Sequence, residues 1–386
     1  MHFELTDAQR AIQDSVGKIC NRFSEDYWAG LDDVRAYPDE FVKALTDEGW
    51  LGLMIPEEYG GGGGTVSDAA LVLEAITRHG AVAASAHAQM YTMGTLLRHG
   101  STDQKARYLP RLASGELRLQ AFGLTEPEAG SDTLSMRTTA VRDGDHYVIN
   151  GGKIFTSRFQ HSDVMMLIAR TTPQEQAQHR THGLSVFLVD LAEAGDAISV
   201  RPIKTMVNHE TNQLFFDDLR VPANNLIGQE GEGFTYLLSG LNVERILVAS
   251  ECIGAGLWFV DRSARYAGER VVFGRAIGAN QGVQFPIAQA FAQLEAASLM
   301  RWQAAAMFEA GHTKGYEANT AKLLASQASW AAANAAMDTF GGYGFAEEYG
   351  IERRFREARL FMVAPVSNNL VLAHIGQHVL GMPRTF

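Results

Sequence analysis

The pair Glu244-Arg245 interrupts an apolar stretch, GLNVERILVAS at 240–250, whose pattern predicts a buried helix. At helical spacing, Leu241, Leu247 and Val248 become neighbours of Glu244. Burying a carboxylate is costly unless it is paired or does chemistry. Apolar neighbours also increase its affinity for a proton, as a general base requires. Glu244 is therefore a candidate general base, and a structural ion pair inside the helices is the alternative.

Other catalytic patterns are missing from the sequence. Thr65-Val66 follows the glycine run 60–64, where a P-loop has Lys-Ser/Thr, so we interpret the run as a flexible turn between helices. The sequence has no GxGxxG after a strand and no HExxH, CxxC or GxSxG. Its twelve histidines form no ligand pair at helical spacing near a carboxylate. We therefore expect no nicotinamide-binding fold, no metal and no serine triad.

The elements that would position Glu244 change type twice along the chain. In the first third, Thr6 and Gln9 form a capping box before a helix, and a second helix has Ser67 as its expected N-cap and Gly80 as its stop. Short alternating strands follow, with a hairpin turn at Asp143-Gly144 and a surface loop at 171–182. Long alanine-rich helices are then predicted over 232–267, 282–311 and 316–340.

These patterns predict an α+β multidomain fold and exclude a doubly wound parallel sheet, because strands and helices do not alternate. We expect an N-terminal helical domain at 1–120, a middle β-barrel or sandwich domain at 121–226, and a C-terminal four-helix bundle at 227–386.

The composition limits the partners. The chain has 386 residues, 46% of them hydrophobic and 20% charged, with a net charge of -11 and no block of Lys and Arg, which argues against a nucleic-acid partner. Two cysteines, Cys20 and Cys252, allow no disulfide framework and suit a reducing compartment. The charged N-terminus has no signal-peptide pattern, and no apolar run is long enough to span a bilayer. A soluble cytoplasmic protein is expected, with no membrane partner.

Two stretches, GLTEPEAGSD (123–132) and DTFGGYGFAEEYGIERRFREARL (338–360), resemble signatures of the acyl-CoA dehydrogenase family. Further resemblances in the family's order cover nearly the whole chain: LGLMIPEEYGGGG (51–63), NGGKIFTS (150–157), DLRVPANNLIGQEGEGF (218–234) and RVVFGRAIGANQGVQFPIA (270–288). The resemblance implies α,β-dehydrogenation of an acyl-CoA thioester: a carboxylate removes the Cα proton and FAD takes the Cβ hydride. It also implies an electron-transfer flavoprotein as acceptor, and a homotetramer or at least a dimer, since subunits share the cofactor site.

The resemblance further assigns residues to the cofactor and the substrate. The flavin ring would lie against Phe122, Leu124, Thr125, Phe155 and Ser157, and the remainder of FAD against Ser131, Arg270, Phe273, Gln281, Asp338, Gly341, Gly342, Ser367 and Asn369. The CoA moiety and pocket edge would be near Ser131, Asn242 and Arg245. Taken alone, Phe155 would be read as β core and Gly341-Gly342 as a helix stop. Asp338 departs from the glutamine that is commoner in the family.

The C-terminal loop departs from the family at its usual catalytic base. Counting on from RFREARL without a gap, Pro365 falls in the base position, and a proline can neither accept a proton nor offer a backbone N–H. Isovaleryl-CoA and long-chain branches carry the base on a helix, directly before an arginine, and Glu244-Arg245 matches that position. Glu251, further along the same segment, is the fallback.

Two other functions remain open. Relatives of this fold act as flavin monooxygenases, nitroalkane oxidases or desulfinases, and Pro365 keeps such chemistry possible. A non-catalytic flavoprotein is the third reading, as in the alkylation-response relatives that bind DNA, but those carry an extra basic C-terminal region that is not in this sequence.

Overall fold

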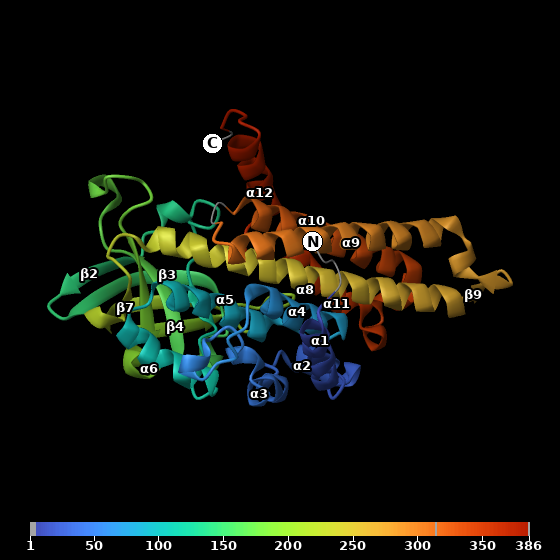
Figure 1. The fold of residues 1–386 in the computed structure, drawn as a ribbon, viewed down its shortest axis with the longest axis horizontal. Coiled ribbons are helices and arrows are strands. Elements are labelled where there is room, and N and C mark those ends of the chain that lie inside the picture. Colours follow the sequence, from blue (N-terminus) through green and yellow to red (C-terminus); the bar gives the residue numbers. More distant parts are fainter. Residues whose placement is uncertain (1–4, 313–314, 385–386) are drawn as a thin grey trace. The chain divides into compact units, whose positions relative to one another are not determined.

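A computed structural model describes residues 5–312 and 315–384. The chain divides into two compact units. Unit 1 contains the described residues up to Val34, Thr65–Ala83, and those from Asn242 onward, whereas unit 2 contains Arg35–Gly64 and Ala84–Leu241. The two units group residues that pack together and so do not test the domain borders expected at 120 and 226. Those borders stay a prediction. Figure 1 shows the fold and labels many of its helices and strands.

The first part of unit 1 consists of helices α1 (Asp7–Cys20), α2 (Glu25–Val34) and α4 (Val66–Arg78). The predicted capping box is confirmed, because the Thr6 and Gln9 side chains each bond to the other residue's backbone N–H. The predicted cap Ser67 is wrong. Thr65 caps α4 instead, in a reciprocal box with Asp68, and places Ser67 inside the first turn. Gly80 follows the helix at a φ of +80°, as a stop requires.

The C-terminal part of unit 1 is a helical bundle, as predicted. Its core is shared by four helices: α8 (Gly233–Glu269), α9 (Gln281–Glu309), α10 (Tyr316–Phe340) and α11 (Ile351–Leu360). Alanine is frequent where they meet, for example at Ala290 and Ala332, which lets helix backbones approach closely. A short hairpin of β9 (Val271–Val272) and β10 (Arg275–Ala276) joins α8 to α9. Helix α12 (Asn368–His374) and a π-helical turn at Ile375–Val379 follow α11.

Unit 2 has helices α3 (Asp39–Asp47), α5 (Ala84–His99) and α6 (Thr102–Ala113) besides its sheet. The glycine run at 60–64 forms a turn, as predicted, and its backbone is hydrogen-bonded to the preceding segment. The backbone N–H groups of Gly61, Gly62, Gly63 and Gly64 all donate to carbonyl groups of residues 52–56. A Cβ atom on Gly61 would lie 2.2 Å from the Ile55 carbonyl oxygen, so only glycine fits there.

The sheet of unit 2 is mixed, with eight strands in the order β6-β7-β3-β2-β4-β5-β8 and β1 paired to β4. The strands are β1 (Ala121–Gly123), β2 (Thr139–Asp143), β3 (His146–Ser157), β4 (Val164–Arg170), β5 (Leu184–Asp190), β6 (Ile198–Pro202), β7 (Thr211–Pro222) and β8 (Leu226–Ile227). The hairpin at Asp143-Gly144 is confirmed by the register of β2 with β3, and the loop at 171–182 lies between β4 and β5. A short helix α7 (Leu191–Ala194) follows β5.

The predicted fold class is thus confirmed: an N-terminal helical part, a middle sheet and a C-terminal bundle. Both faces of β4 are buried, and Met166 and Leu167 belong to different core clusters on opposite sides of the sheet. Within the described residues, no helix is long and apolar enough to cross a membrane.

Candidate active site

In unit 2, the predicted ring contacts begin at β1. Phe122, Leu124 and Thr125 are each half-buried. Ala121, which precedes Phe122, and Gly123, which follows it, are buried. The pairing of Ala121–Gly123 with β4 fixes this alternation. The Phe122 ring meets Tyr91 of α5 edge-on, with ring centroids 5.5 Å apart. Phe122 in β1, and Leu124 and Thr125 just after it, therefore stay partly accessible.

Phe155 is not β core, because 60% of it is exposed. It lies in a β-bulge, where Ile154 and Phe155 of β3 are opposite the single residue Gln213 of β7, and its φ is +58°. Positive φ is uncommon for a bulky residue, and bulges turn side chains into new directions at functional sites. The Ile154 N–H donates to the Thr125 carbonyl at 2.8 Å, so the bulge lies beside the end of β1. An exposed aromatic ring in this position fits a residue that covers a flavin.

Ser157 has its hydroxyl oriented by a network that the sequence did not reveal. Asn208 Nδ2 donates to Ser157 Oγ at 2.6 Å. Arg158 donates to Asn208 Oδ1 at 2.7 Å, and since a guanidinium cannot accept, the amide orientation is fixed. Thr211 uses its only hydroxyl hydrogen on the Asn208 carbonyl at 2.6 Å. Ser157 therefore accepts from Asn208, and its own hydrogen can be donated either to Thr211 Oγ1, 3.3 Å away, or to a bound ligand.

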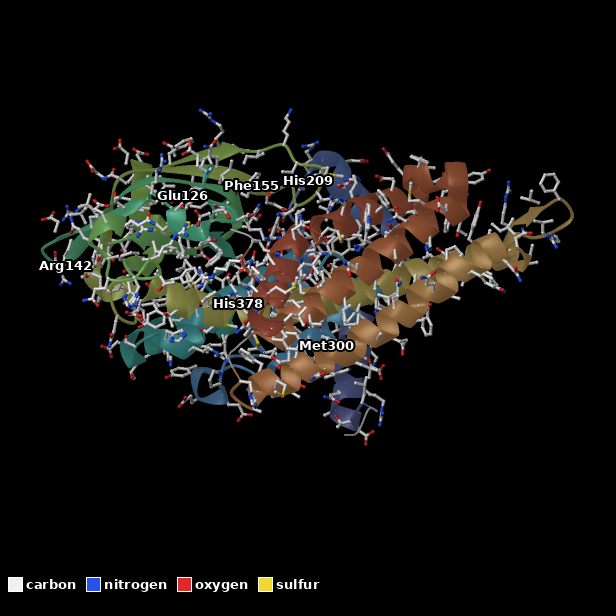
Figure 2. All side chains as sticks on the ribbon, turned by 90° about the horizontal axis from the view of Figure 1, so that it is seen from above. Glu126, Arg142, Phe155, His209, Met300 and His378 are labelled. Carbon is white, nitrogen blue, oxygen red and sulfur yellow. The ribbon has the colours of Figure 1, made fainter. Side chains whose placement is uncertain are left out.

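Behind these residues lies a buried ion pair that sequence reasoning also missed. Lys153 Nζ donates to Glu126 Oε1 at 2.8 Å and to the Leu124 carbonyl at 3.1 Å, and Lys153 is fully buried. Figure 2 labels Glu126 and Phe155 on this unit. The sequence feature that could have indicated this pair is a lysine at an inward-facing position of a predicted strand, directly after two glycines.

Ser131, predicted near the pyrophosphate and CoA, is exposed in a turn after β1. The next residue, Asp132, accepts two hydrogen bonds from Arg180, at 2.8 and 2.9 Å. These bonds tie the turn to the loop at 171–182. These contacts do not bring Ser131 next to another of the predicted site residues.

In unit 1, a cavity of about 630 Å³ brings together two residues assigned to FAD, Arg270 and Gly342. Tyr343 also lines it, and the Arg270 guanidinium carbon lies 5.6 Å from the centre of that ring. The backbone of Gly341 has a φ of +58°, and a Cβ atom on Gly341 or Gly342 would meet nothing within 4 Å. Open space beside accessible backbone, next to a cation, suits a phosphate group.

Other residues assigned to FAD lie on the surface of unit 1. Phe273, at the tip of the β9–β10 hairpin, is fully exposed with a φ of +51°. Gln281 begins α9, and Asp338 is exposed near the end of α10. Ser367 caps α12, accepting from Leu370 N at 3.3 Å, while Asn369 is exposed.

Glu244 is buried on α8, with 6% of it exposed, and Arg245 is buried beside it. Arg245 donates to Asn242 Oδ1 at 3.0 Å, so two of the residues assigned to the substrate are bonded to each other. Burial lowers the pKa of Arg245, and the Glu244 carboxylate partly offsets this. Glu251, the fallback base, is also buried, and its carbonyl accepts from Thr77 at 3.0 Å.

The loop that contains Pro365 is anchored by Lys322 of α10, which is fully buried. Its Nζ donates to the Val366 carbonyl at 2.7 Å and to Asn368 Oδ1 at 2.8 Å. Asn368 in turn donates to Ser326 at 3.0 Å and, through its N–H, to the Met362 carbonyl at 3.2 Å.

The electrostatics connect this anchor with the candidate base. Burial lowers the pKa of Lys322 to about 8; the charge of Arg245 adds to this effect, and that of Glu244 opposes it. Arg245 and Lys322 are therefore two cations whose charges interact with Glu244. Sequence reasoning missed Lys322 and Asn368, since neither matched a motif.

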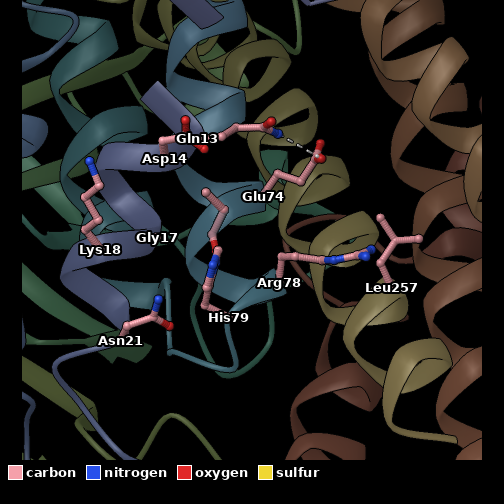
Figure 3. A pocket seen from close by; sticks show the side chains of 10 residues that line it. Gln13, Asp14, Gly17, Lys18, Asn21, Glu74, Arg78, His79 and Leu257 are labelled. Atoms are coloured by element: carbon pink, nitrogen blue, oxygen red, sulfur yellow. Dashed lines mark hydrogen bonds between the residues drawn. The ribbon is translucent and has the colours of Figure 1, made fainter. Parts of the chain in front are cut away.

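A second cavity in unit 1, of about 500 Å³, is lined by α1, α4 and Leu257 of α8 (Figure 3). None of the residues predicted to form the site lines it. Two of its four charged side chains form ion pairs, as Arg78 bonds Asp261 at 2.7 Å and Glu74 bonds Arg301 at 2.7 Å. We therefore place the candidate active site elsewhere.

The fold and these residues define a class of protein, a flavin-dependent dehydrogenase with helical, sheet and helical parts. The residues fit FAD: an aromatic ring is exposed at a bulge, an oriented hydroxyl can donate, and glycine backbone lies open beside Arg270. Sequence models of the acyl-CoA dehydrogenase N-terminal, middle and C-terminal domains match residues 6–116, 121–219 and 231–380. The chain belongs to the acyl-CoA dehydrogenase family, an oxidoreductase family that uses FAD to dehydrogenate acyl-CoA thioesters.

Similar proteins agree over almost the whole chain. An acyl-CoA dehydrogenase of Bacillus subtilis is 36% identical over 349 residues, 89% of this chain and 90% of the relative. A structure of a glutaryl-CoA dehydrogenase with glutaryl-CoA has a TM-score of 0.92 at 31% identity, covering 100% of this chain and 98% of its own. A chain from a structure of the electron transferring flavoprotein of Acidaminococcus fermentans has a TM-score of 0.91 at 30% identity, covering 98% and 100%.

Proposed function

We propose that the protein converts a saturated acyl-CoA thioester to a trans-2-enoyl-CoA and that Glu244 is the general base. One observation carries the choice of base: Glu244 is a buried carboxylate on α8 that is acted on by two cations. Pro365 occupies the loop position where the family usually has its base, and it has no group that accepts a proton.

In this proposal each group of the chain has one role. The Glu244 carboxylate takes the Cα proton, and Arg245 and Lys322 are the cations whose charges interact with it. Thr125 and Ser157 would orient the flavin ring through hydrogen bonds, Phe155 would cover one face, and Arg270 with Gly342 would hold the phosphate-containing half. FAD, when bound, supplies the acceptor for the Cβ hydride.

The test is anaerobic mixing of the holoprotein with a panel of saturated acyl-CoAs, followed by the absorbance of oxidised flavin. We expect bleaching by at least one acyl-CoA, and a rate about 10²- to 10⁴-fold lower in Glu244→Gln with FAD still bound, as for loss of a general base. Glu251→Gln tests the fallback base on the same helix, and the proposal expects this variant to bleach at the wild-type rate. Bleaching of Glu244→Gln at the wild-type rate would assign the proton transfer to another group.

A second function is favoured by Pro365, namely a flavoenzyme of the same fold with oxidase, monooxygenase or desulfinase chemistry. The same panel run in air distinguishes it. Oxygen consumption that keeps pace with substrate loss supports the second function, whereas turnover that needs an added electron acceptor supports dehydrogenation.

We also propose a homotetramer or dimer that passes electrons to an electron-transfer flavoprotein. Exposed apolar residues support assembly, since Phe273 is fully exposed and Phe285, Phe291 and Leu299 of α9 are each about half exposed. Light scattering of the holoprotein and of Phe291→Ser, at a position that is not assigned to FAD, measures the assembly. FAD loss from a dissociated variant of this kind would support a shared site. The similarity to a chain from an electron-transferring flavoprotein structure supports the acceptor, which a reduction assay with purified flavoprotein tests.

A further inference from the structure

The buried pair of Lys153 and Glu126 connects two segments that carry assigned flavin contacts. Lys153 is the last residue of β3 before the bulge that exposes Phe155. Its Nζ donates to the Leu124 carbonyl at 3.1 Å and to Glu126 Oε1 at 2.8 Å, on the two sides of Thr125. The backbone bond from Ile154 N to the Thr125 carbonyl, at 2.8 Å, lies between them.

Glu126 extends the same connection to the far end of the following loop. Its Oε2 accepts from Arg137 N at 2.6 Å, and its Oε1 accepts from Thr138 N at 3.0 Å. One side-chain pair therefore fixes the start of the loop, its return to β2, and the approach to the bulge. A second buried cation, Arg170, supports the return by donating to the Leu134 and Met136 carbonyls at 2.7 and 3.2 Å.

Stability alone does not explain such a pair. Taking a lysine and a glutamate out of water is costly, and apolar side chains of similar size would often serve the core as well or better. A buried pair with several backbone partners does define one arrangement of those partners, because shifting any of them leaves a charge without its bonds. What it defines here is the relative position of Leu124, Thr125 and Phe155.

We propose that Lys153 and Glu126 are positioning residues for the flavin, holding the end of β1 and the Phe155 bulge in the geometry that the ring requires. This rests on the proposed flavin contacts of Leu124, Thr125 and Phe155. Neither residue needs to touch FAD, since Lys153 is fully buried and Glu126 is 7% exposed.

The charge states at neutral pH support the pair. Burial lowers the pKa of Lys153 to about 8, opposed by Glu126 and reinforced by Arg170. Burial alone would raise the pKa of Glu126, but Lys153 and the hydrogen bonds from Thr138 and Arg137 outweigh it, and the net shift is downward. Both residues are therefore charged at neutral pH, with the ammonium being the first to be lost as pH rises.

The experiment measures FAD binding to apoprotein of Lys153→Met, by quenching of FAD fluorescence and by the visible spectrum of the bound flavin. We expect FAD affinity about tenfold lower or more, and an altered spectrum, because the ring contacts are no longer fixed. Lys43→Met is the matched control, as it removes an exposed ion pair with Asp47 in the same unit and should leave both readouts unchanged. Glu126→Gln, nearly identical in shape, gives the same test should Lys153→Met fail to fold.

The double variant Lys153→Met with Glu126→Gln separates positioning from support of the fold. Removing the unpaired charge should recover thermal stability relative to Lys153→Met, while FAD affinity and spectrum stay altered. The inference would be overturned if FAD affinity and the flavin spectrum recovered together with thermal stability in the double variant. It would also be overturned by wild-type affinity and spectrum in the single variants. Failure of the wild-type apoprotein to bind FAD would instead contradict the proposed flavin site itself.

Discussion

Replacing Lys322 by methionine tests how the loop that contains Pro365 is held. Methionine keeps most of the side-chain volume but removes the ammonium that donates to the Val366 carbonyl and to Asn368 Oδ1. Ser326 still bonds Asn368 in the variant, so the loop loses one anchor completely and the other in part. We expect the loop to open more often while α10 stays folded.

The magnitude follows from two opposing contributions. Each hydrogen bond to a charged group contributes about 1.5–3 kcal/mol. Against this, lowering the pKa of Lys322 to about 8 corresponds to about 3 kcal/mol of disfavoured charge, which methionine does not carry. The lost hydrogen bonds and the relieved cost of the buried charge largely cancel in the free energy of global unfolding. Local opening of the loop depends only on the lost hydrogen bonds. A loss of about 2 kcal/mol there speeds amide exchange about 30-fold.

Hydrogen exchange of the Asn368 amide, which donates to the Met362 carbonyl, reports on that opening. Lys18→Met, on the exposed face of α1 in the same unit, is the control and should leave the exchange unchanged. An Asn368 amide that exchanges at the wild-type rate in Lys322→Met would refute the anchoring. Exchange that rises equally in all four bundle helices would show a general loss of stability instead.

Three further outcomes are expected. The dissociation constant for FAD should be constant below about pH 8 and should rise above it. Burial lowers the pKa of Lys153 to about 8, with Glu126 opposing and Arg170 reinforcing the shift, so above this pH the ammonium that pairs with Glu126 is lost. In Lys153→Met the dissociation constant should not change over the same pH range. Arg301→Leu leaves its partly buried partner carboxylate, Glu74 of α4, without this cation and should lower the free energy of unfolding by about 1–3 kcal/mol, measured by urea denaturation. Thr65→Ala removes the cap of α4 and should cost about 1 kcal/mol in the same measurement.

Helix boundaries were predictable where one cap dominated and not where two competed. At α1, Thr6 and Gln9 have the spacing of a capping box and no rival stands beside them. At α4, both Thr65 and Ser67 are good caps, and the choice depends on Asp68, whose side chain reaches back to the Thr65 N–H. The glycine run at 60–64 was predicted as a flexible turn because composition cannot show the four backbone bonds that hold it.

The assigned flavin residues came from motifs, whereas the residues that hold them came only from the structure. Strand alternation would place Phe155 on the inner face together with Lys153, and the bulge between them is what exposes one and leaves the other buried. Asn208 orients Ser157 from a position 51 residues away in sequence, within a polar stretch that resembles any loop. Contacts of this kind depend on tertiary packing, which local patterns do not encode.

Lys153 in unit 2 and Lys322 in unit 1 solve one physical problem in the same way. A loop that must present a defined backbone geometry needs its carbonyl groups bound, and regular secondary structure cannot do so where the chain changes direction. A buried ammonium provides up to three donors at one point, and here each lysine joins a backbone carbonyl to the side chain of a second residue, Glu126 or Asn368. Arginine would spread its donors over a wider plane and could not converge on the same acceptors. The cost of burying two lysines is therefore understandable only if the loops they hold, at the flavin contacts and at Pro365, have to keep their shape.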